Sequence, residues 1–377
     1  MTARVCTFCV MDDSNPGVVF DLGGRCNACQ DAQARMAQEW WPGEDGQRRL
    51  MALTVRLKDA GRGNSYDAMI GLSGGVDSAY LAHIAVRRMG LRVLAVHVDG
   101  GWNSEPAVRN IESMVRRLGI DLHTHVIEWG EMRDLQLAFL RASVLNQDIP
   151  QDHAFFATLY RTAHRFGIRN FLSGVNFSSE SVSPPLQGSP TAIDGTHVRG
   201  VHRRFGTRPL EHFPVMSLAE YLWLTKLSGS LTIHKPLNYL PYDKDAAKAE
   251  LTRLYDWRDY GGKHHESRFT KFYEEIYLPR KYRFDKRRQH LSSLIVAGQL
   301  TREQALAQVE GPATDSSSER RDMRYIAKKL GIAIDELAKL LAETPVQHSQ
   351  YPNQLWLHRM LMTARRRLRN ARDGASE

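Results

Sequence analysis

The stretch GLSGGVDS combines the residue types that bind a phosphate chain. Its adjacent glycines, Gly74 and Gly75, let the backbone approach a phosphate without a Cβ atom in the way. Ser73 and Ser78 offer hydroxyl donors, and a helix beginning here would point its free N–H groups at the anion. Asp77 repels phosphate, so it makes sense as a ligand of Mg²⁺ that bridges to the phosphates. The stretch predicts a nucleotide site that differs from the Walker loop and from the G-x-G-x-x-G fingerprint.

Two pairs of cysteines near the N-terminus predict a metal site. The four cysteines of the chain occur as Cys6-x-x-Cys9 and Cys26-x-x-Cys29. Two such pairs are typical of a tetrahedral Zn²⁺ site, because each pair forms a turn that points both sulfurs at one ion. Free thiols or a disulfide are the alternative, and a disulfide suits a cytoplasmic chain poorly. A closed four-sulfur site has no open position, so we expect structural zinc.

Composition and charge bound the kind of protein that carries these residues. The 377 residues are 42% hydrophobic and 25% charged, as in an ordinary soluble globular protein. We find neither an apolar run of about 20 residues nor a secretory signal, and expect a cytoplasmic protein without a membrane segment. The net charge of +9 fits phosphate-bearing ligands such as nucleotides, nucleotide sugars or RNA. Part of the excess lies in the arginine-rich run 359–372, which is either a solvated helix face or a nucleic-acid patch.

Strands that alternate with helices must position the phosphate loop. We predict strands at 68–72, 91–98, 122–128 and 169–174, and helices near 78–89, 106–118, 131–145 and 154–166. This alternation is typical of an α/β fold with a doubly wound parallel sheet. Such sheets bind their ligands beyond the carboxyl ends of the strands, where the loop lies.

The remaining segments suggest a division into five parts. We predict a hairpin within NPGVVFDLGGRC, a loop-like stretch at 175–208, a capping box at Thr301 and Gln304, and a flexible joint at 313–320. The parts are a zinc-ribbon-like module at 1–35, a helical connector at 36–65, a nucleotide domain at 66–235, a helical region closing over the site at 236–312, and C-terminal helices at 313–377.

The motif SGGVDS resembles the pyrophosphate-binding loop (PP-loop) of the N-type ATP pyrophosphatases, which include GMP, NAD and asparagine synthetases. The resemblance implies an adenine nucleotide alpha-hydrolase-like fold and cleavage of ATP between its α- and β-phosphates. SGVNFSSE resembles a segment of NAD synthetase whose acidic residue shares the Mg²⁺, which implies Gly174 and Asn176 beside the nucleotide and Glu180 on the metal. Position alone places Val98 and Asp99 where related enzymes meet adenosine.

Four features in one order resemble the N-acetyl sugar amidotransferases of bacterial surface-polysaccharide synthesis. They are CxxCVM-D, the phosphate loop, AVHVDGGWNSE, and the long stretch that begins GGKHHESRFTKFYEEIYLPRKYRFDKRRQHL. The resemblance implies that an acetamido group on a nucleotide-activated sugar becomes an acetamidino group. The product would enter O-antigen, capsule or flagellar glycan.

The stretch GGKHHESRF suits this chemistry, because two glycines precede a dense set of charged side chains. We read it as a loop that closes over the phosphates. We predict that Lys263 binds the α-phosphate and that His264 or His265 accepts a proton from the incoming ammonium. Arg268 and Lys271 are alternatives for the phosphate. A charged surface loop without these roles is the competing interpretation.

Two further pairs are candidates for contact with the sugar nucleotide. Asp152 and His153 follow Pro150 at a possible strand edge facing the site. Lys286 and Arg287 could bind the diphosphate or a sugar carboxylate, although a solvated helix face explains them equally well.

The source of nitrogen follows from the cysteine count. Release of ammonia from glutamine needs an activated cysteine, and the proposed zinc site uses all four. We therefore expect a separate glutaminase subunit, with or without a channelling partner, as the family resemblance also implies.

Two other classes of function remain open. A tRNA thiolase or tRNA-directed amine ligase would combine a PP-loop with a zinc module, but the absence of cysteines after Cys29 argues against sulfur transfer. A non-catalytic nucleotide-binding scaffold fits poorly with Asp77 and Glu180. We accordingly do not expect a nucleic-acid partner.

Overall fold

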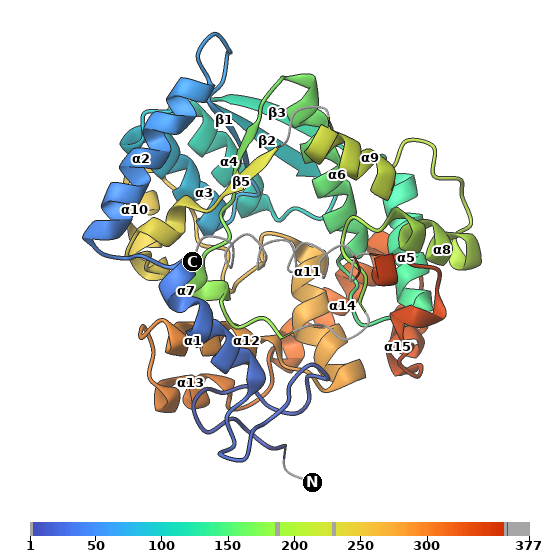
Figure 1. Ribbon diagram of the computed structural model, residues 1–377. Coiled ribbons are helices and arrows are strands. Elements are labelled where there is room, and N and C mark those ends of the chain that lie inside the picture. Colours follow the sequence, from blue (N-terminus) through green and yellow to red (C-terminus); the bar gives the residue numbers. More distant parts are fainter. Residues whose placement is uncertain (1–2, 185–188, 228–230, 358–359, 361–377) are drawn as a thin grey trace.

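A five-stranded parallel sheet lies at the centre of the nucleotide domain (Figure 1). The computed structural model describes residues 3–184, 189–227, 231–357 and 360, so the arginine-rich run at 359–372 lies outside the described residues. The strand order is β3-β2-β1-β4-β5, and every pairing is parallel. The strands are β1 (Ala68–Gly71), β2 (Val93–Asp99), β3 (Asp121–Val126), β4 (Asn170–Leu172) and β5 (Thr232–His234).

The sheet has its switch point between β1 and β4. The chain builds outward from β1 through β2 to β3, and then returns to add β4 and β5 on the other side. Ile70 in β1 pairs with Ala95 on one side and with Leu172 on the other. Ligand sites of doubly wound sheets form where the strand order reverses. The phosphate loop after β1 and the segment SGVNFSSE after β4 therefore meet at this point.

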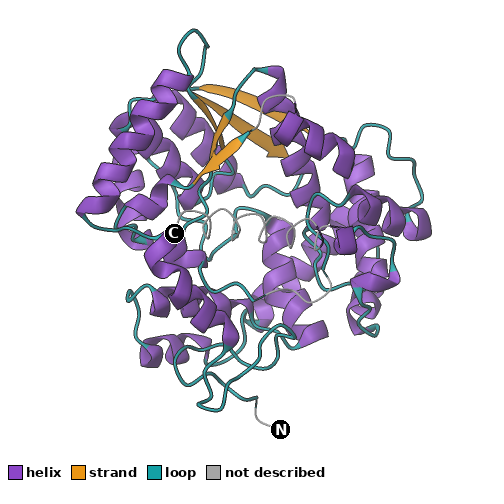
Figure 2. Cartoon of the chain, viewed as in Figure 1, coloured by secondary structure: helices purple, strands orange, loops and turns teal. Residues whose placement is uncertain are grey.

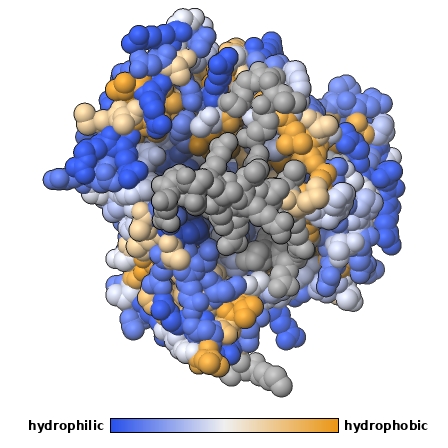
Figure 3. Space-filling model, viewed as in Figure 1, coloured by the Kyte–Doolittle hydropathy of each residue, from blue (hydrophilic) through white to orange (hydrophobic). Residues whose placement is uncertain are grey.

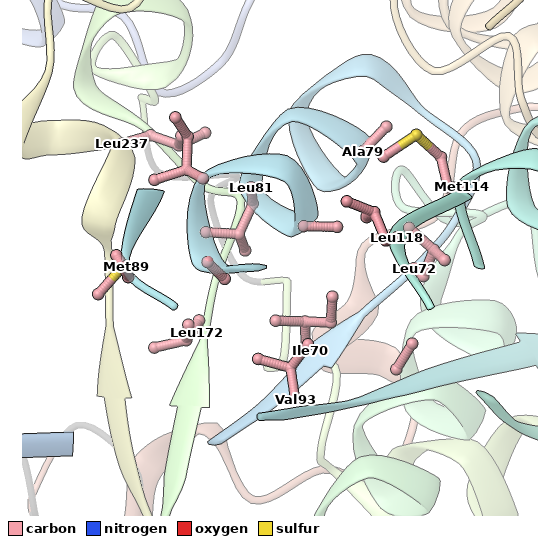
Figure 4. Packing of buried hydrophobic residues seen from close by; sticks show 14 of the residues in the cluster. Ile70, Leu72, Ala79, Leu81, Met89, Val93, Met114, Leu118, Leu172 and Leu237 are labelled. Carbon is pink, nitrogen blue, oxygen red and sulfur yellow. The ribbon is translucent and has the colours of Figure 1, made fainter. Parts of the chain in front are cut away.

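Alternation along the strands builds a core on each face of the sheet. Ala68 and Ile70 point to one face, while Met69 between them points to the other. The first face packs against α2, α3, α4 and α10, and Figure 4 shows Ile70, Leu81 and Met114 meeting there. The second face packs mainly against α6, and α5 and α8 pack around α6. The helices are α2 (Glu44–Ala60), α3 (Val76–His83), α4 (Glu105–Leu118), α5 (Trp129–Ala142), α6 (Ile149–Arg165), α8 (Gly195–Phe205), α9 (Leu218–Leu222) and α10 (Lys244–Tyr255).

The N-terminal module folds around its cysteines. The predicted hairpin is present in a minimal form: Phe20 and Cys26 make an antiparallel bridge, and the Asp21 and Asn27 amides donate to the carbonyls of Arg25 and Val19 around the turn. The helical connector is interrupted, since α1 (Asn27–Glu39) ends before Trp40 and α2 begins after Gly43.

Helices fill the C-terminal part, which lies below the sheet in Figures 1 and 2. The predicted capping box is confirmed, because Thr301 and Gln304 exchange hydrogen bonds at the start of α13. The flexible joint predicted at 313–320 is wrong, since the side chain of Asp315 caps α14 from its first turn. The elements are α11 (Arg268–Phe272), the π-helix η4 (Tyr273–Tyr282), α12 (Lys286–Val296), α13 (Arg302–Val309), α14 (Ser316–Leu330) and α15 (Ile334–Ala342).

One lysine ties the C-terminal helices to the sheet. The Nζ atom of Lys329 in α14 donates to the carbonyl of Gly101, just beyond β2. The same ammonium lies 5.2 Å from the ring centre of Trp102 and 4.9 Å from that of Trp129. Cation–π contacts of this kind stabilise a buried contact between elements.

The surface gives no sign of a membrane segment. Among the described residues, no helix is long and apolar enough to cross a membrane. On the face shown in Figure 3, hydrophilic residues cover most of the described surface and the hydrophobic residues form separate patches.

Candidate active site

The phosphate loop connects the end of β1 to the first turn of α3. Its hydrogen bonds hold the turn closed: the Gly75 amide donates to Oγ of Ser73 at 3.2 Å, and the Ser73 amide donates to Oγ of Ser78 at 3.3 Å. The amide of Val76, the first residue of α3, donates to the hydroxyl of Tyr260 at 3.1 Å. Helix N-termini attract anions, so the dipole of α3 supports a phosphate at this loop.

The two glycines of the loop meet different surroundings. Gly74 has φ +82°, and a Cβ atom there would lie 2.3 Å from the carbonyl oxygen of Ala107 in α4. A Cβ atom on Gly75 would instead lie 2.9 Å from the Glu266 carboxylate, across a cavity. Gly74 is therefore needed for folding of the turn, and Gly75 keeps the cavity open.

Asp77 is held in place by two donors. Its Oδ1 atom accepts from the Tyr242 hydroxyl at 2.5 Å and from Nδ2 of Asn176 at 3.2 Å. Its Oδ2 atom makes no hydrogen bond to the described residues. Asn176 in turn caps α7 (Phe177–Glu180) by accepting from the Ser179 amide. The segment after β4 thus orients the carboxylate that follows β1.

Glu180 forms an ion pair with Lys263 at 3.0 Å. Burial works against the charge of Glu180, but Lys263 and His264 lower the pKa of this carboxylate to about 2. Burial likewise opposes the charge of Lys263, while Glu180 and Asp77 raise the pKa of the ammonium. Both groups are charged at neutral pH and face the same cavity as Asp77.

We call this space the loop cavity; its volume is about 330 Å³. Its carboxylates supply hard oxygen ligands of the kind that Mg²⁺ prefers, and its lysines suit phosphate. The donor set therefore fits a magnesium–nucleotide complex. The polar lining consists of Ser73, Asp77, Ser78, Asp152, Ser173, Glu180, Lys244, Tyr260, Lys263, His264 and Glu266, with Gly75 and Gly174.

A second space, the acidic cavity, adjoins the loop cavity and has a volume of about 350 Å³. Ser73, Asp152 and His264 line both. Asp152 is exposed to the cavity, and desolvation by the surrounding protein raises its pKa to about 6. Burial and the neighbouring Asp152 also raise the pKa of Asp148 well above its usual value. Val98 lies on the wall, whose polar residues are Ser73, Asn103, Asp148, Gln151, Asp152, His264, Glu266, Ser267, Thr270 and Glu274.

The histidines of the GGKHH loop point to different neighbours. His265 Nε2 lies 2.7 Å from Glu275, and its Nδ1 accepts from the Gly262 amide at 2.9 Å. His264 lines both cavities. Burial opposes its charged form, but Glu266 and Glu274 raise the pKa of His264 to about 9.

Two predicted site residues, His153 and Asp99, are not among the lining residues of either cavity, whereas Asp152 lines both. The strand edge expected at Asp152 and His153 is wrong, because both belong to α6. His153 is fully buried and bonds the backbone of Ala192 and Met216. Asp99 shapes a turn by accepting from the Gly101 amide.

The cations predicted to follow the loop serve the C-terminal packing. Arg268 and Lys271 both pair with Asp322 of α14, at 2.8 and 2.6 Å. Arg287 is bound by Asp285 and donates to the backbone of Gly311. Lys286 lines a smaller cavity of about 210 Å³ beside Lys263 and His290.

Sequence analysis missed several polar residues that line or support the cavities. Asp148 is one of them, and its position one helical turn before the predicted Asp152 signals two carboxylates on one face of α6. The others carry no local signal, because distant segments bring them to the loop. They are Tyr242, Lys244, Tyr260, Glu266, Glu274 and His290.

A larger open groove of about 780 Å³ lies between α6, α8 and the segment 209–215. Arg161, Arg199 and Arg203 line it, but none of the predicted site residues does. The predicted site residues therefore gather at the two smaller adjoining cavities.

The four cysteines converge at the N-terminus. Their sulfur atoms lie within 4.8 Å of one another, with Cys6 to Cys29 at 3.8 Å and Cys9 to Cys26 at 3.5 Å. Sulfurs bound to one zinc ion at about 2.3 Å are roughly 3.8 Å apart, so the cluster fits Zn²⁺. All four side chains are fully buried and unoxidised.

Comparison with known proteins places two domain types in the chain. The NAD synthase family model matches residues 51–144. The model described as "LPS biosynthesis protein WbpG-like, C-terminal domain" matches residues 266–365. The first match includes the phosphate loop and the second begins within the GGKHHESRF stretch.

Individual relatives are distant. A glutamine-hydrolyzing GMP synthase from Pyrobaculum aerophilum is 32% identical over 89 residues, which are 24% of this chain and 16% of that enzyme. The NMN synthetase from Francisella tularensis is 18% identical, with 76% of this chain and 97% of that chain covered and a TM-score of 0.34. The U34-tRNA thiolase NcsA from Methanococcus maripaludis is 14% identical, with 84% and 92% covered and a TM-score of 0.31.

The motif resemblance, the sheet topology and the family models agree on a PP-loop domain that uses ATP. The chain thus combines an NAD synthase-like PP-loop domain with a WbpG-like C-terminal domain, a combination consistent with the N-type ATP pyrophosphatase superfamily.

Proposed function

We propose that the protein is an ATP-dependent amidotransferase that converts an acetamido group of a nucleotide-activated sugar to an acetamidino group. The amide oxygen would attack the α-phosphorus of ATP and release pyrophosphate. Ammonia would then add to the activated carbon, and AMP would leave with the former amide oxygen. One ATP and one ammonia are consumed, and the oxygen of the amide departs in AMP.

One observation carries this proposal: the loop cavity and the acidic cavity share a wall. Ser73 of the NAD synthase-like region and Glu266 of the WbpG-like region line both cavities, and Ser267, Thr270 and Glu274 of the WbpG-like region line the acidic cavity. An amide held in the acidic cavity would face the nucleotide in the loop cavity. Holding two reactants in this way removes much of the entropic barrier.

The side chains suit the separate steps. Ser73, Gly75 and Lys263 would bind the phosphates, and Lys263 would stabilise the charge that develops on them. Asp77 and Glu180 would hold Mg²⁺, which neutralises the β- and γ-phosphates. Lys244 adds a second cation to the same wall.

Asp152 is better suited than His264 to accept the proton of the incoming ammonium. The pKa of His264 is about 9, so at neutral pH this imidazole is already protonated. The pKa of Asp152 is about 6, so its carboxylate is mostly ionised and is still a moderate base.

The proposed glycan pathway and the glutaminase partner rest on the WbpG-like match and on the cysteines. The matched family is described as an LPS biosynthesis protein. The cluster near the N-terminus holds every thiol of the chain, so the cavities contain none to attack glutamine or to carry sulfur. We infer that a separate subunit supplies ammonia.

The test is incubation of the purified protein with ATP, ammonium and a panel of UDP- and CMP-activated N-acetyl sugars. We expect AMP, pyrophosphate and a sugar product with the mass shift of an O-to-NH exchange. Asp77→Asn should lower the rate by at least about 100-fold. ADP in place of AMP would exclude the mechanism, and turnover with tRNA but with no sugar would exclude the substrate.

A further inference from the structure

Three metal-ligating side chains converge beside the acidic cavity, and the proposed reaction leaves them without a role. His264 comes from the loop after Gly262, Glu274 from η4 and His290 from α12. Each offers one ligand atom, and these atoms lie within 4.8 Å of one another. The cluster is built by tertiary structure, because a different segment supplies each member.

The distance between His290 and Glu274 does not fit a direct hydrogen bond. Nε2 of His290 lies 3.9 Å from Oε2 of Glu274. This separation is too long for a hydrogen bond, and the nitrogen has no other hydrogen-bond partner among the described residues. Two atoms bound to one zinc ion at about 2.0–2.2 Å are roughly 3.4 Å apart. The two ligands thus stand slightly wider than an ion between them would require.

The backbone at the cluster is unusual on two of its three segments. His264 has φ +60°, a conformation that a side chain of this size rarely adopts. Such conformations persist where the surroundings enforce them, and they are common at binding sites. Glu274 lies in a π-helix, another feature that is common at functional sites.

The charge around the cluster calls for a cation. The acidic cavity is lined by four carboxylates, those of Asp148, Asp152, Glu266 and Glu274. His264 is the one basic side chain among its described lining residues, while Lys263, Lys286 and Arg287 line the smaller cavity that Glu274 and His290 also line. Carboxylates gathered in a partly closed space repel one another unless a positive group joins them.

We propose that His264, Glu274 and His290 bind Zn²⁺ or a similar divalent transition metal. This site would be separate from the magnesium ligands Asp77 and Glu180 and from the four cysteines. Metal binding would displace the proton that His264 holds in the absence of an ion, because a ligating imidazole is neutral. Two imidazoles and one carboxylate leave a coordination position open. His264 and Glu274 line the acidic cavity, and Glu274 and His290 line the smaller cavity, so the ion would be reached from the acidic cavity on the side of His264. There the ion would bind an oxygen of the sugar substrate, a role that rests on the proposed function.

The test measures metal content directly. The full-length protein and its variants are dialysed against buffered Zn²⁺, and the bound zinc per chain is measured by mass spectrometry. We expect the wild type to bind one zinc more than Glu274→Gln or His290→Gln. Glu275→Gln, which changes the adjacent carboxylate, should bind as much as the wild type. Cobalt in place of the additional zinc should give a visible absorption band that both ligand variants lose.

The outcomes separate this proposal from the proposed function. If the wild type binds only the zinc of the cysteine cluster, the inference is wrong, whatever the folding of the variants. Equal zinc in the wild type and in folded Glu274→Gln would also overturn it. Asp77→Asn should keep the additional zinc while it loses AMP formation. The zinc measurement therefore tests the metal site even if no sugar is converted in the activity assay.

Discussion

The two glycines of the phosphate loop differ in what surrounds them, and this difference predicts opposite phenotypes. Gly74→Ala should destabilise the protein by about 2 kcal/mol or more, because alanine is strained at φ +82° and its methyl group would meet backbone. Gly75→Ala should fold with a nearly normal melting temperature, since its methyl group meets only side-chain atoms, those of the Glu266 carboxylate and the Ser73 hydroxyl. It should nevertheless turn over ATP slowly. Thermal unfolding and AMP release are measured for both variants. A destabilised Gly75→Ala protein beside a stable, slow Gly74→Ala protein would contradict the roles given to the two glycines.

The pKa of Asp152 predicts how the rate depends on pH. A carboxylate with pKa about 6 loses its basic form as pH falls through 6, so the rate should decline below that pH. The assay must hold free NH₃ constant at each pH, because ammonium itself titrates at higher pH. Lys286 lowers the pKa of Asp152, and Lys286→Gln should therefore move the decline to higher pH. A decline near pH 4, where a free carboxylate titrates, would contradict the role of Asp152.

Sequence patterns identified the site residues that follow strands and missed those brought by the fold. Asp77 and Glu180 belong to motifs next to strand ends, so parallel topology alone puts them at one edge. Tyr242 supports Asp77 from 165 residues away, and no local pattern signals this contact. Arg268 and Lys271 misled us because charge density in a sequence does not distinguish a ligand site from an ion pair with Asp322.

The zinc module supports the helix that carries Glu180. The cysteine cluster packs with Phe177 of α7 and Val296 of α12. Trp40 stacks on Phe177 with ring centres 5.7 Å apart, and Arg35 donates to the carbonyl of Ser181. A structural ion that holds α7 would affect ATP turnover without touching the nucleotide.

Removal of one sulfur ligand tests this connection. Cys9→Ser should lower the free energy of unfolding by on the order of 4 kcal/mol, as loss of a structural metal does. It should also reduce kcat, because α7 loses its support. Thr7→Ala, in the same turn but exposed, should change neither. A folded Cys9→Ser protein with normal zinc content would refute the cluster as a zinc site.

Strong periodicity revealed the main strands and helices, whereas short elements and helix starts were missed. β5 has three residues at the edge of the sheet, too few for alternation to show. The segment 175–208 was read as a loop from its Ser, Pro and Gly content, yet it contains α7 and α8. ATDSSSER was read as a joint for the same reason, although Asp315 and the serines form a helix N-terminus.

The cysteine count of the whole chain predicts its nitrogen source. Purified alone, the protein should use ammonium at raised pH, where free NH₃ is abundant, and should ignore glutamine. The reason is that its four thiols are buried together at the N-terminus, away from both cavities. Addition of a cognate glutaminase should make glutamine effective at neutral pH. Glutamate release from glutamine by the isolated chain would disprove this and the zinc assignment together.

The wall shared by the two cavities has a consequence for inheritance. The NAD synthase-like region and the WbpG-like region meet at the proposed reaction centre, since Ser73 and Glu266 line both cavities. A recombination event that exchanged one region would also replace half of the catalytic wall. We therefore expect the two regions to evolve together. A change of substrate preference should require substitutions in both regions, on the two sides of the shared wall.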